Sequence, residues 1–209
     1  MKQRLISFEG IDGSGKSTQI NLLAEWFSNK CVDYIIVREP GGTSISERIR
    51  DILLDKKNLH LTGESESFLF LSARAQLVDE VIKPALNDGK FVICDRFIDS
   101  TIAYQGYGRG MDLLKLKAMN DMAIDGCVIG QTFLLDVNVE NSIKRRSNHE
   151  DDRMEAAGYS FMEKVRNGYL ELSAEYPNRF MILNGNKPKN EIFEKIIERI
   201  DNIYGELND

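Results

Sequence analysis

The residues Gly10-Ile-Asp-Gly-Ser-Gly-Lys-Ser17 decide the fold of this chain. They follow an alternating apolar stretch at Leu5 to Glu9 and open an amphipathic stretch that begins at Lys16. The spacing G-x-x-x-x-G-K-[ST] between a strand and a helix is typical of a loop whose backbone N–H groups surround phosphates at a helix N-terminus. The stretch therefore predicts an α/β fold with a nucleoside triphosphate site.

The same loop supplies the first candidate site residues. The expected phosphate ligands are Gly10, Asp12, Gly13, Ser14, Gly15, Lys16, Ser17 and Thr18. Lys16 is expected to reach the β and γ phosphates as a catalytic residue, and the Ser17 hydroxyl is expected to bind Mg²⁺. The loop therefore predicts Mg²⁺ as a cofactor.

A phosphate loop alone does not assign an activity, because motors, GTPases, kinases and scaffolds share it. Guanine-specific switches carry Asn-Lys-x-Asp, and the nearest match here is Asn186-Lys187-Pro188-Lys189. Lys189 stands where those proteins have the carboxylate that binds guanine. A GTPase is therefore excluded.

The rest of the chain repeats the alternation of strand and helix. Further strands are expected at Tyr34 to Val37, Phe91 to Asp95, Thr132 to Val137 and Phe180 to Leu183. Apolar spacing predicts helices at Lys16 to Asn29, Ser46 to Leu54, Glu64 to about Asn87, Leu113 to Asp125, Glu140 to Arg146, Tyr159 to Glu175 and Lys189 to Tyr204. Pro84 is expected to bend or end the third helix. The pattern predicts a P-loop NTPase-like fold of three layers, with a five-stranded parallel sheet flanked by helices.

The 209 residues contain no repeat and no low-complexity linker, so residues 1–209 are expected to form one domain. The stretch Arg145 to Gly158 is rich in charge and nearly free of apolar residues, which fits a small lid. A solvated helix face is the alternative, and the charge pattern by itself favours it.

Composition limits the partners. The 27 Lys and Arg residues against 33 Asp and Glu residues give a net charge of −6, which argues against binding nucleic acid or an anionic membrane. The apolar runs are far shorter than the ~20 residues needed to cross a bilayer, and no secretory signal is present, so a cytoplasmic protein is expected. Cys31, Cys94 and Cys127 lack the spacing of a zinc site or a disulfide framework and are expected to be reduced.

Arginines indicate a second anion site. The strand at Phe91 to Asp95 is followed by Arg96, which places a carboxylate and a guanidinium where ligands of parallel sheets bind. Asp95 is expected to hold Mg²⁺ through water, and Arg96 to bind a phosphate. A simple Asp–Arg ion pair is the alternative.

Further arginines stand near other predicted strand ends and on nearby helices, at Arg38, Arg50 and Arg74. Phe70 and Arg74 are four residues apart on one predicted helix, so they share a face on which a ring stacks on a base while the guanidinium binds its edge. Phe68 is expected to pack in the core instead.

Four blocks of this sequence resemble the bacterial type of the thymidylate kinase family. They are Phe8-Glu-Gly-Ile-Asp-Gly-Ser-Gly-Lys-Ser-Thr18, Arg38-Glu-Pro-Gly-Gly-Thr43, Phe70-x-x-x-Arg74 and Asp95-Arg-Phe-Ile-Asp-Ser-Thr-Ile-Ala-Tyr-Gln-Gly106, and the similarity extends to Asp152-Arg-Met-Glu155. The resemblance implies transfer of a phosphoryl group from ATP to dTMP, with ATP and dTMP as small-molecule partners, by a homodimer.

The resemblance also implies roles for single residues. The dTMP ligands it implies are Asp12, Arg38, Arg50, Phe70, Arg74, Arg96, Thr101, Tyr104 and Gln105. In this assignment Phe70 stacks on thymine, Arg74 binds the base carbonyl and Gln105 contacts the base edge. Tyr104 lies under the sugar, Asp12 approaches its 3′-hydroxyl, and Arg38, Arg50 and Arg96 bind the monophosphate.

One departure from related sequences bears on catalysis. Eukaryotic members carry a basic residue where this chain has Gly13. The positive charge on the transferring group is then expected from the lid, with Arg146 and Arg153 as the catalytic candidates beside Lys16 and Arg96. Arg153 is favoured, because it lies in the Asp152-Arg-Met-Glu155 match.

Two other functions remain open at this stage. A deoxynucleoside kinase needs a carboxylate base for the 5′-hydroxyl, and Glu39 is the candidate. A nucleotide-dependent binding module needs only one nucleotide site, so the four arginines at positions 38, 50, 74 and 96 count against it.

Overall fold

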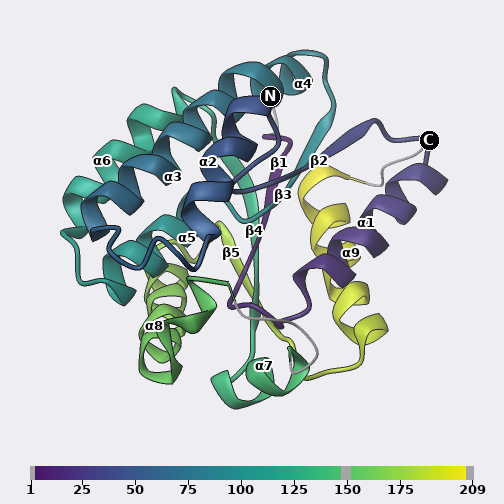
Figure 1. Ribbon diagram of the computed structural model, residues 1–209. Helices are drawn as coiled ribbons and strands as arrows, with labels where there is room; N and C mark the ends of the chain where they lie inside the picture. Colours follow the sequence, from purple (N-terminus) through teal and green to yellow (C-terminus); the bar gives the residue numbers. More distant parts are fainter. Residues whose placement is uncertain (1–2, 147–151, 206–209) are drawn as a thin grey trace.

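The computed structural model describes residues 3–146 and 152–205, and it is built around one five-stranded sheet (Figure 1). Its strands are β1 (Leu5–Glu9), β2 (Tyr34–Arg38), β3 (Phe91–Asp95), β4 (Ile129–Asp136) and β5 (Phe180–Asn184). They run in the order β2-β3-β1-β4-β5, and every neighbouring pair is parallel. The predicted five-stranded parallel sheet of a P-loop NTPase-like fold is confirmed.

Helices cover both faces of the sheet. They are α1 (Lys16–Asn29), α2 (Ser44–Leu54), α3 (Gly63–Leu77), α4 (Lys83–Asn87), α5 (Ile98–Thr101), α6 (Leu113–Ile124), α7 (Val139–Arg145), α8 (Tyr159–Glu175) and α9 (Lys189–Tyr204), with a 3₁₀ turn η3 at Glu155–Ala157. In Figure 1, α1 and α9 lie to the right of the strands, and α3 and α6 lie to the left. No helix within residues 3–146 and 152–205 is long and apolar enough to span a bilayer.

Apolar side chains from both helical layers meet the sheet. Between α1, α9 and the strands, Phe8, Phe27, Phe133 and Ile196 are fully buried in one cluster. Two further clusters fill the opposite face, under α3, α6 and α8. Because both faces of the central strands are covered, most of their residues are apolar, as in β3 from Phe91 to Cys94, although β1 and β4 also carry buried polar side chains such as Ser7 and Gln131.

The fourth strand begins earlier than the sequence predicts, at Ile129 instead of Thr132, and ends at Asp136. Ile129 pairs with Leu5, after which the register between β1 and β4 shifts. That irregularity lies at a polar glycine-containing stretch, which hides the strand pattern in the sequence.

The long helix predicted from Glu64 to Asn87 is three elements. The helix α3 ends at Leu77, a wider π-helical turn η1 follows at Val78–Ile82, and α4 starts at Lys83 with Pro84 in its first turn. Proline is compatible with a first turn because its missing N–H has no helical partner there. The helix therefore changes geometry before Pro84 and continues.

The segment that follows β3 was not predicted as helical. Here α5 is followed directly by a second π-helical stretch, η2, at Ile102–Gly108. Residues 102 to 106 are all buried, so no 3.6-residue apolar pattern marks the segment. Three of the predicted site residues lie here, Thr101 at the end of α5 and Tyr104 and Gln105 on η2.

Phe68 is not a core residue, contrary to the prediction, because 59 % of it is exposed on α3. It lies on a side of the molecule where α2, α3 and α6 pack next to one another. Large apolar side chains that are also exposed on these helices are Ile45, Ile52, Leu114 and Met122. We refer to these five side chains as the apolar helical face.

Candidate active site

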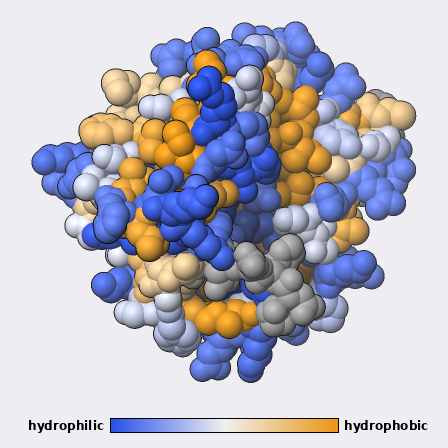
Figure 2. Space-filling model, viewed as in Figure 1, coloured by the Kyte–Doolittle hydropathy of each residue, from blue (hydrophilic) through white to orange (hydrophobic). Residues whose placement is uncertain are grey.

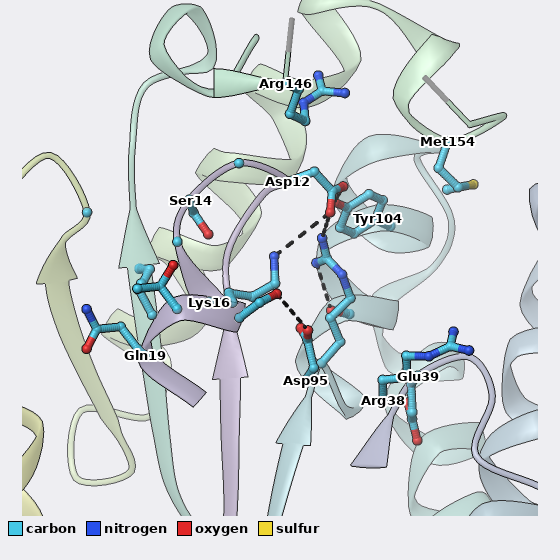
Figure 3. Close-up of a pocket in the computed structure, with 18 of the residues that line it drawn as sticks. Asp12, Ser14, Lys16, Gln19, Arg38, Glu39, Asp95, Tyr104, Arg146 and Met154 are labelled. Atoms are coloured by element: carbon cyan, nitrogen blue, oxygen red, sulfur yellow. Dashed lines mark hydrogen bonds and ion pairs between the residues drawn. The ribbon is translucent and has the colours of Figure 1, made fainter. Parts of the chain in front are cut away.

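A cavity of about 1090 Å³ opens at the carboxyl edge of the sheet. Figure 2 shows it as a hollow near the middle of one face, among mostly hydrophilic side chains, and Figure 3 shows side chains that line it. It brings together the predicted residues Asp12, Gly13, Ser14, Gly15, Lys16, Ser17, Thr18, Arg38, Arg50, Phe70, Arg74, Asp95, Arg96, Thr101, Tyr104, Gln105 and Arg146. Gly10 and Arg153 are the predicted residues that do not line it.

Gly10 lies at the base of the phosphate loop. A Cβ atom there would stand 2.5 Å from the Leu135 carbonyl oxygen, and its φ of 132° is one that side chains rarely adopt. The position needs glycine because the loop passes directly over β4. Gly10 therefore shapes the loop from beneath the cavity.

Gly13 faces the helix α7. Its φ is 74°, and an added Cβ would come within 2.7 Å of the Ser142 carbonyl oxygen and 3.2 Å of Arg146 Cγ. The Ser142 hydroxyl donates to the Asp12 carbonyl, at 2.6 Å, and Arg145 Nη1 donates to the Gly13 carbonyl, at 3.2 Å. The loop is thus packed against α7, and the side of Gly13 is taken by Arg146.

Lys16 is buried at the centre of the loop. Its Nζ donates to the carbonyl oxygens of Gly10 and Ile11, at 3.0 and 3.2 Å, and lies 3.9 Å from Asp12 Oδ1. Burial, together with the charge of Arg96, lowers the pKa of the Lys16 ammonium. An incoming phosphate would provide a charged acceptor where the ammonium now has mainly carbonyl oxygens.

Ser17 and Asp95 form the predicted metal position at the mouth of the loop. The Ser17 hydroxyl lies 3.4 Å from Asp95 Oδ2. Both groups offer oxygen, the ligand that Mg²⁺ prefers, and Mg²⁺ commonly takes few ligands from the protein and the rest from phosphates and water. No group of three or more possible metal-ligating His, Cys, Asp or Glu side chains occurs among the described residues.

Arg96 is fixed between the loop and the acceptor side of the cavity. Its backbone is left-handed, with a φ of 70°, which turns the side chain back over β1. The guanidinium donates to the Gly10 carbonyl at 2.9 Å, to Tyr169 Oη at 3.1 Å and to Asp12 Oδ1 at 2.6 Å. It also stands 5.2 Å from the centre of the Tyr104 ring.

Asp12 forms ion pairs with both Lys16 and Arg96. Burial acts to raise the pKa of this carboxyl, but the charges of Arg96 and Lys16 outweigh burial and hold the pKa well below its usual range. The hydroxyl of Tyr104 donates to Asp12 Oδ2 at 3.2 Å, and burial raises the pKa of that hydroxyl. Asp12 is therefore an anionic acceptor that also positions the tyrosine.

Two of the predicted phosphate-binding arginines approach the cavity from β2 and α2. Arg50 Nη1 donates to the Pro40 carbonyl at 2.8 Å, and Arg38 Nη2 donates to Glu47 Oε2 at 2.9 Å. The Arg38 side chain is 47 % exposed, so its ion pair is open to exchange with a ligand. Together with Arg96, these residues line the cavity with three guanidinium groups.

Arg74 is deeply buried and fully bonded. Its N–H groups donate to both carboxylate oxygens of Glu39, to Thr101 Oγ1, to Asn120 Oδ1 and to the Phe97 carbonyl. Since a guanidinium has five N–H donors, a bond from Arg74 to a base must share a donor with one of these acceptors. Thr101 accepts from Arg74, so its own hydroxyl proton remains for a ligand.

Glu9, which the motif does not single out, is completely buried under this site. It accepts hydrogen bonds from the Phe97 backbone N–H and from the hydroxyls of Ser7, Ser100 and Tyr169. Burial, with a contribution from Asp99, raises the pKa of Glu9 to about 7. Glu9 thus supports the turn that carries Arg96.

The two candidate lid arginines lie in different surroundings. Arg146, at the end of α7, lines the cavity beside Asp12 (Figure 3). Arg153 is 6 % exposed, and its guanidinium contacts Glu66 at 2.6 Å and the Leu53 carbonyl at 2.6 Å. The structure therefore does not place the favoured candidate, Arg153, at the phosphate loop. Residues 147–151 of the predicted lid at 145–158 lie outside the described residues.

Several lining residues were missed by sequence reasoning. Glu39 belongs to a quoted block but was considered only as a base. Gly185, Lys187 and Lys189 also line the cavity, and the last two belong to the stretch used to exclude a GTPase. Gln19, whose Nε2 donates to the Lys189 carbonyl, lies next to them. Their place between β5 and α9 was the available signal, since ligands bind at the carboxyl ends of such strands.

Comparison with known proteins identifies the family of this site. The family model described as thymidylate kinase matches residues 8–196. The chain belongs to the thymidylate kinase family. It is therefore an enzyme, and the resemblance read from its motifs is confirmed.

Individual thymidylate kinases match nearly the whole chain. That of Thermoanaerobacter sp. (strain X514) is 44 % identical over 198 residues, which cover 95 % of this chain and 97 % of the relative. That of Thermosipho africanus (strain TCF52B) is 47 % identical over 191 residues, which cover 91 % and 94 %. The crystal structure of thymidylate kinase from Ehrlichia chaffeensis superposes with a TM-score of 0.76 at 36 % identity, covering 96 % of this chain and 99 % of that one.

Proposed function

We propose that this chain transfers the γ-phosphoryl group of ATP to dTMP, giving ADP and dTDP. The observation that carries the proposal is a single cavity lined both by the phosphate loop with Lys16 and by the guanidinium groups of Arg38, Arg50 and Arg96, which would form two anion subsites. Two polyanionic substrates bound at these positions could place the attacking oxygen in line with the γ-phosphorus. The thymidylate kinase relatives support dTMP as the acceptor.

The reaction requires no general base. A phosphate monoester has a second pKa of about 6, so an oxygen of dTMP is already an anionic nucleophile at neutral pH. That oxygen forms a bond to the γ-phosphorus, and the bond to the β–γ bridging oxygen breaks, which leaves ADP. The work of the protein is to position both phosphates and to neutralise their charge.

Lys16 and the loop N–H groups would hold the donor phosphates. Ser17 and Asp95 would hold Mg²⁺, which supplies positive charge to the phosphate oxygens when it is bound. Arg96 would bind the acceptor phosphate while its contact with Asp12 keeps its guanidinium at the junction of the two subsites.

Arg146 is the proposed lid arginine in place of Arg153. It lies where the side chain of a larger residue at position 13 would point, since an added Gly13 Cβ would be 3.2 Å from Arg146 Cγ. A positive charge supplied by the loop in other members would therefore come from α7 here. Arg153 is tied to Glu66, which gives it a positioning role.

The nucleoside would lie between α3 and η2. Phe70 is partly exposed in the cavity and is available for stacking, while Thr101 and Gln105 offer polar atoms at the base edge. Tyr104 would stand under the sugar, and Asp12 would approach the 3′-hydroxyl.

The two alternatives are less well supported. Glu39 is the candidate base of a deoxynucleoside kinase, but it is 7 % exposed and its carboxylate is bonded to Arg74 through both oxygens. Burial also raises its pKa. A binding module without transfer chemistry would have no need for the second, arginine-lined subsite.

The decisive experiment is a coupled ADP-release assay with ATP and a panel of acceptors. We expect turnover with dTMP, dependence on Mg²⁺, and no turnover with thymidine, because three arginines would face an uncharged hydroxyl. Equal rates with thymidine and dTMP would support a nucleoside kinase, and absence of ADP release with every acceptor would support a binding module.

We also propose a cytoplasmic homodimer, with residues 1–209 forming one catalytic domain in each copy. The apolar helical face supports the dimer, since clustered exposed apolar side chains commonly mark interfaces. Phe68→Glu combined with Met122→Glu should convert a dimer to a monomer in sedimentation equilibrium. An unchanged mass would exclude this face. ATP, the phosphoryl donor, is used in the cytoplasm, which supports that location.

A further inference from the structure

Glu66 is a buried carboxylate that contacts a residue of the site. The proposed transfer reaction does not use it. It lies on α3, one turn before Phe70, and is 1 % exposed. Oε1 accepts from Gln105 Nε2 at 2.9 Å and from Arg109 Nε at 3.3 Å. Oε2 accepts from Arg109 Nη2 at 3.1 Å and from Arg153 Nη1 at 2.6 Å.

These contacts use the whole bonding capacity of the carboxylate. An ionised carboxylate has about four acceptor positions and no donor. Four N–H groups occupy them here, two of them from Arg109. Arg109 and Arg153 form ion pairs with Glu66, so this carboxylate acts only as an acceptor. Gln105, which bonds to Oε1, must therefore be a donor.

The orientation of the Gln105 amide follows from this constraint. The two ends of an amide have nearly the same shape, so its hydrogen-bond partners decide which end faces which way. Glu66 accepts only, so the NH₂ end of Gln105 must face it. The carbonyl oxygen Oε1 is then the acceptor that this side chain offers to a ligand in the cavity, which Gln105 lines, beside the second N–H of Nε2.

A fixed acceptor at this position discriminates between pyrimidines. Thymine and uracil carry a hydrogen on N3 and therefore donate, whereas N3 of cytosine is an acceptor. If cytosine were bound, its N3 and the Gln105 carbonyl oxygen would both be acceptors, and neither would have a hydrogen-bond partner. Buried polar groups left unpaired in this way give a site strong selectivity against the wrong base.

We propose that Glu66 is a specificity-determining positioning residue, which orients the Gln105 amide so that its carbonyl oxygen selects a base with an N3–H donor. The inference rests on the proposed function, because it assumes a pyrimidine next to Gln105. It assigns Glu66 no contact with the substrate.

The test compares kcat/KM for dTMP, dUMP and dCMP in the wild type and in Glu66→Gln. In that variant the carbonyl oxygen of residue 66 will take the Oε2 position, where Arg109 Nη2 and Arg153 Nη1 donate, and its NH₂ group will take the Oε1 position next to Gln105, with loss of the longer Arg109 Nε contact. Gln105 will then turn its NH₂ group to the base. We expect the dTMP-to-dCMP ratio of kcat/KM to fall at least tenfold, mainly through KM. The dTMP-to-dUMP ratio should stay within threefold, because both bases donate from N3.

A double-variant arm separates orientation from general damage. Gln105→Met keeps the length of the side chain but has no amide to orient. In that background, Glu66→Gln should leave the dTMP-to-dCMP ratio unchanged within threefold. The matched control is Arg109→Met, which removes another partner of Glu66 but leaves the Gln105 contact, and it should preserve the wild-type ratio within threefold.

The outcomes distinguish the inference from the proposed function. A folded Glu66→Gln enzyme that keeps the wild-type ratio, or the same loss of ratio in the Gln105→Met background, overturns the inference while dTMP turnover by the wild type stands. If Glu66→Gln does not fold, the inference is tested by the kcat/KM values of Gln105→Met alone. It should lower kcat/KM at least tenfold for dTMP and leave that for dCMP within threefold, and a larger loss for dCMP overturns the inference.

Discussion

The phosphate loop and the proposed acceptor pocket are built in different ways. The loop is one contiguous stretch of main chain, with Lys16 bonded mainly to its carbonyl oxygens. The proposed acceptor pocket is assembled from β2, α2, α3, η2 and the turn after β3. Three of its arginines are bonded to carboxylates, Arg38 to Glu47, Arg74 to Glu39 and Arg96 to Asp12. A site made of main chain needs glycines, whereas a site made of buried charges needs counter-charges elsewhere in the fold.

The difference predicts that variants near the loop lose catalysis and variants in the pocket lose stability as well. The largest effect is expected for Arg146→Ala. Removing the lid charge should lower kcat by about 10³, the lower end of what such an arginine contributes to phosphoryl transfer. Binding of dTMP by calorimetry should stay within threefold, because Arg146 faces the loop.

Lys144→Ala is the matched control for this variant, since Lys144 is an exposed residue of the same helix, α7. It should keep full activity. If Arg146→Ala retains more than a tenth of the wild-type kcat, the charge on the transferring group comes from Lys16 or Arg96, and the loop does not depend on α7 for catalysis.

The second prediction concerns Arg74→Met on the acceptor side. The variant leaves the buried Glu39 carboxylate without its partner, which should lower the free energy of unfolding by about 3–5 kcal/mol in chemical denaturation. Adding Glu39→Gln should restore part of this loss, because the uncompensated charge is then removed, while the KM for dTMP stays raised. A single variant as stable as the wild type would contradict the view that the pocket is held by paired charges.

A smaller effect is expected from Glu9, whose pKa is raised from 4.5 to about 7. The folded protein keeps this proton at pH values where the unfolded chain has lost it. The contribution of Glu9 to stability is therefore complete below pH 4.5 and is lost as the pH rises to about 7. The shift corresponds to up to about 3 kcal/mol.

Glu9→Gln imitates the protonated form and should remove this dependence. Denaturant unfolding at pH 5 and pH 8 measures it, and the variant should gain stability relative to the wild type at the higher pH. A difference between the two proteins that is the same at both pH values would show that Glu9 does not titrate in this range.

The smallest effect is expected at the sugar. Tyr104→Ala should narrow the preference for dTMP over its ribonucleotide counterpart by up to about tenfold, since a packed side chain rejects one added hydroxyl only modestly. Tyr107→Ala is the control, because Tyr107 is on the same element, η2, and does not line the cavity. A ratio of kcat/KM that is unchanged in Tyr104→Ala would remove Tyr104 from sugar selection.

The same difference explains what could be predicted from the sequence. The phosphate loop and all five strands were predicted, because glycine spacing and continuous apolar runs are local signals. The helix η2 was missed, because five consecutive buried residues leave no periodic pattern. Phe68 was placed in the core because a phenylalanine on a helix of unknown orientation gives no sign of its exposure.

The carboxylates that position the arginines were the main omission. Glu66 is 87 residues from Arg153 in the sequence, yet its carboxylate meets that guanidinium at 2.6 Å. No local pattern encodes such a pair. The sequence therefore marked the arginines as candidates for ligand binding without showing that Arg153 has an internal partner, and nothing local opposed the preference for Arg153 that came from the Asp152-Arg-Met-Glu155 match.

The saturated bonding of Arg74 has a thermodynamic consequence. Holding a long side chain in one conformation costs up to about 2 kcal/mol of conformational entropy. All five N–H groups of Arg74 are already bonded in the protein without ligand, so that entropy is lost during folding and not during association. A nucleotide that enters this pocket meets a preformed surface, and its affinity is not reduced by the ordering of this arginine.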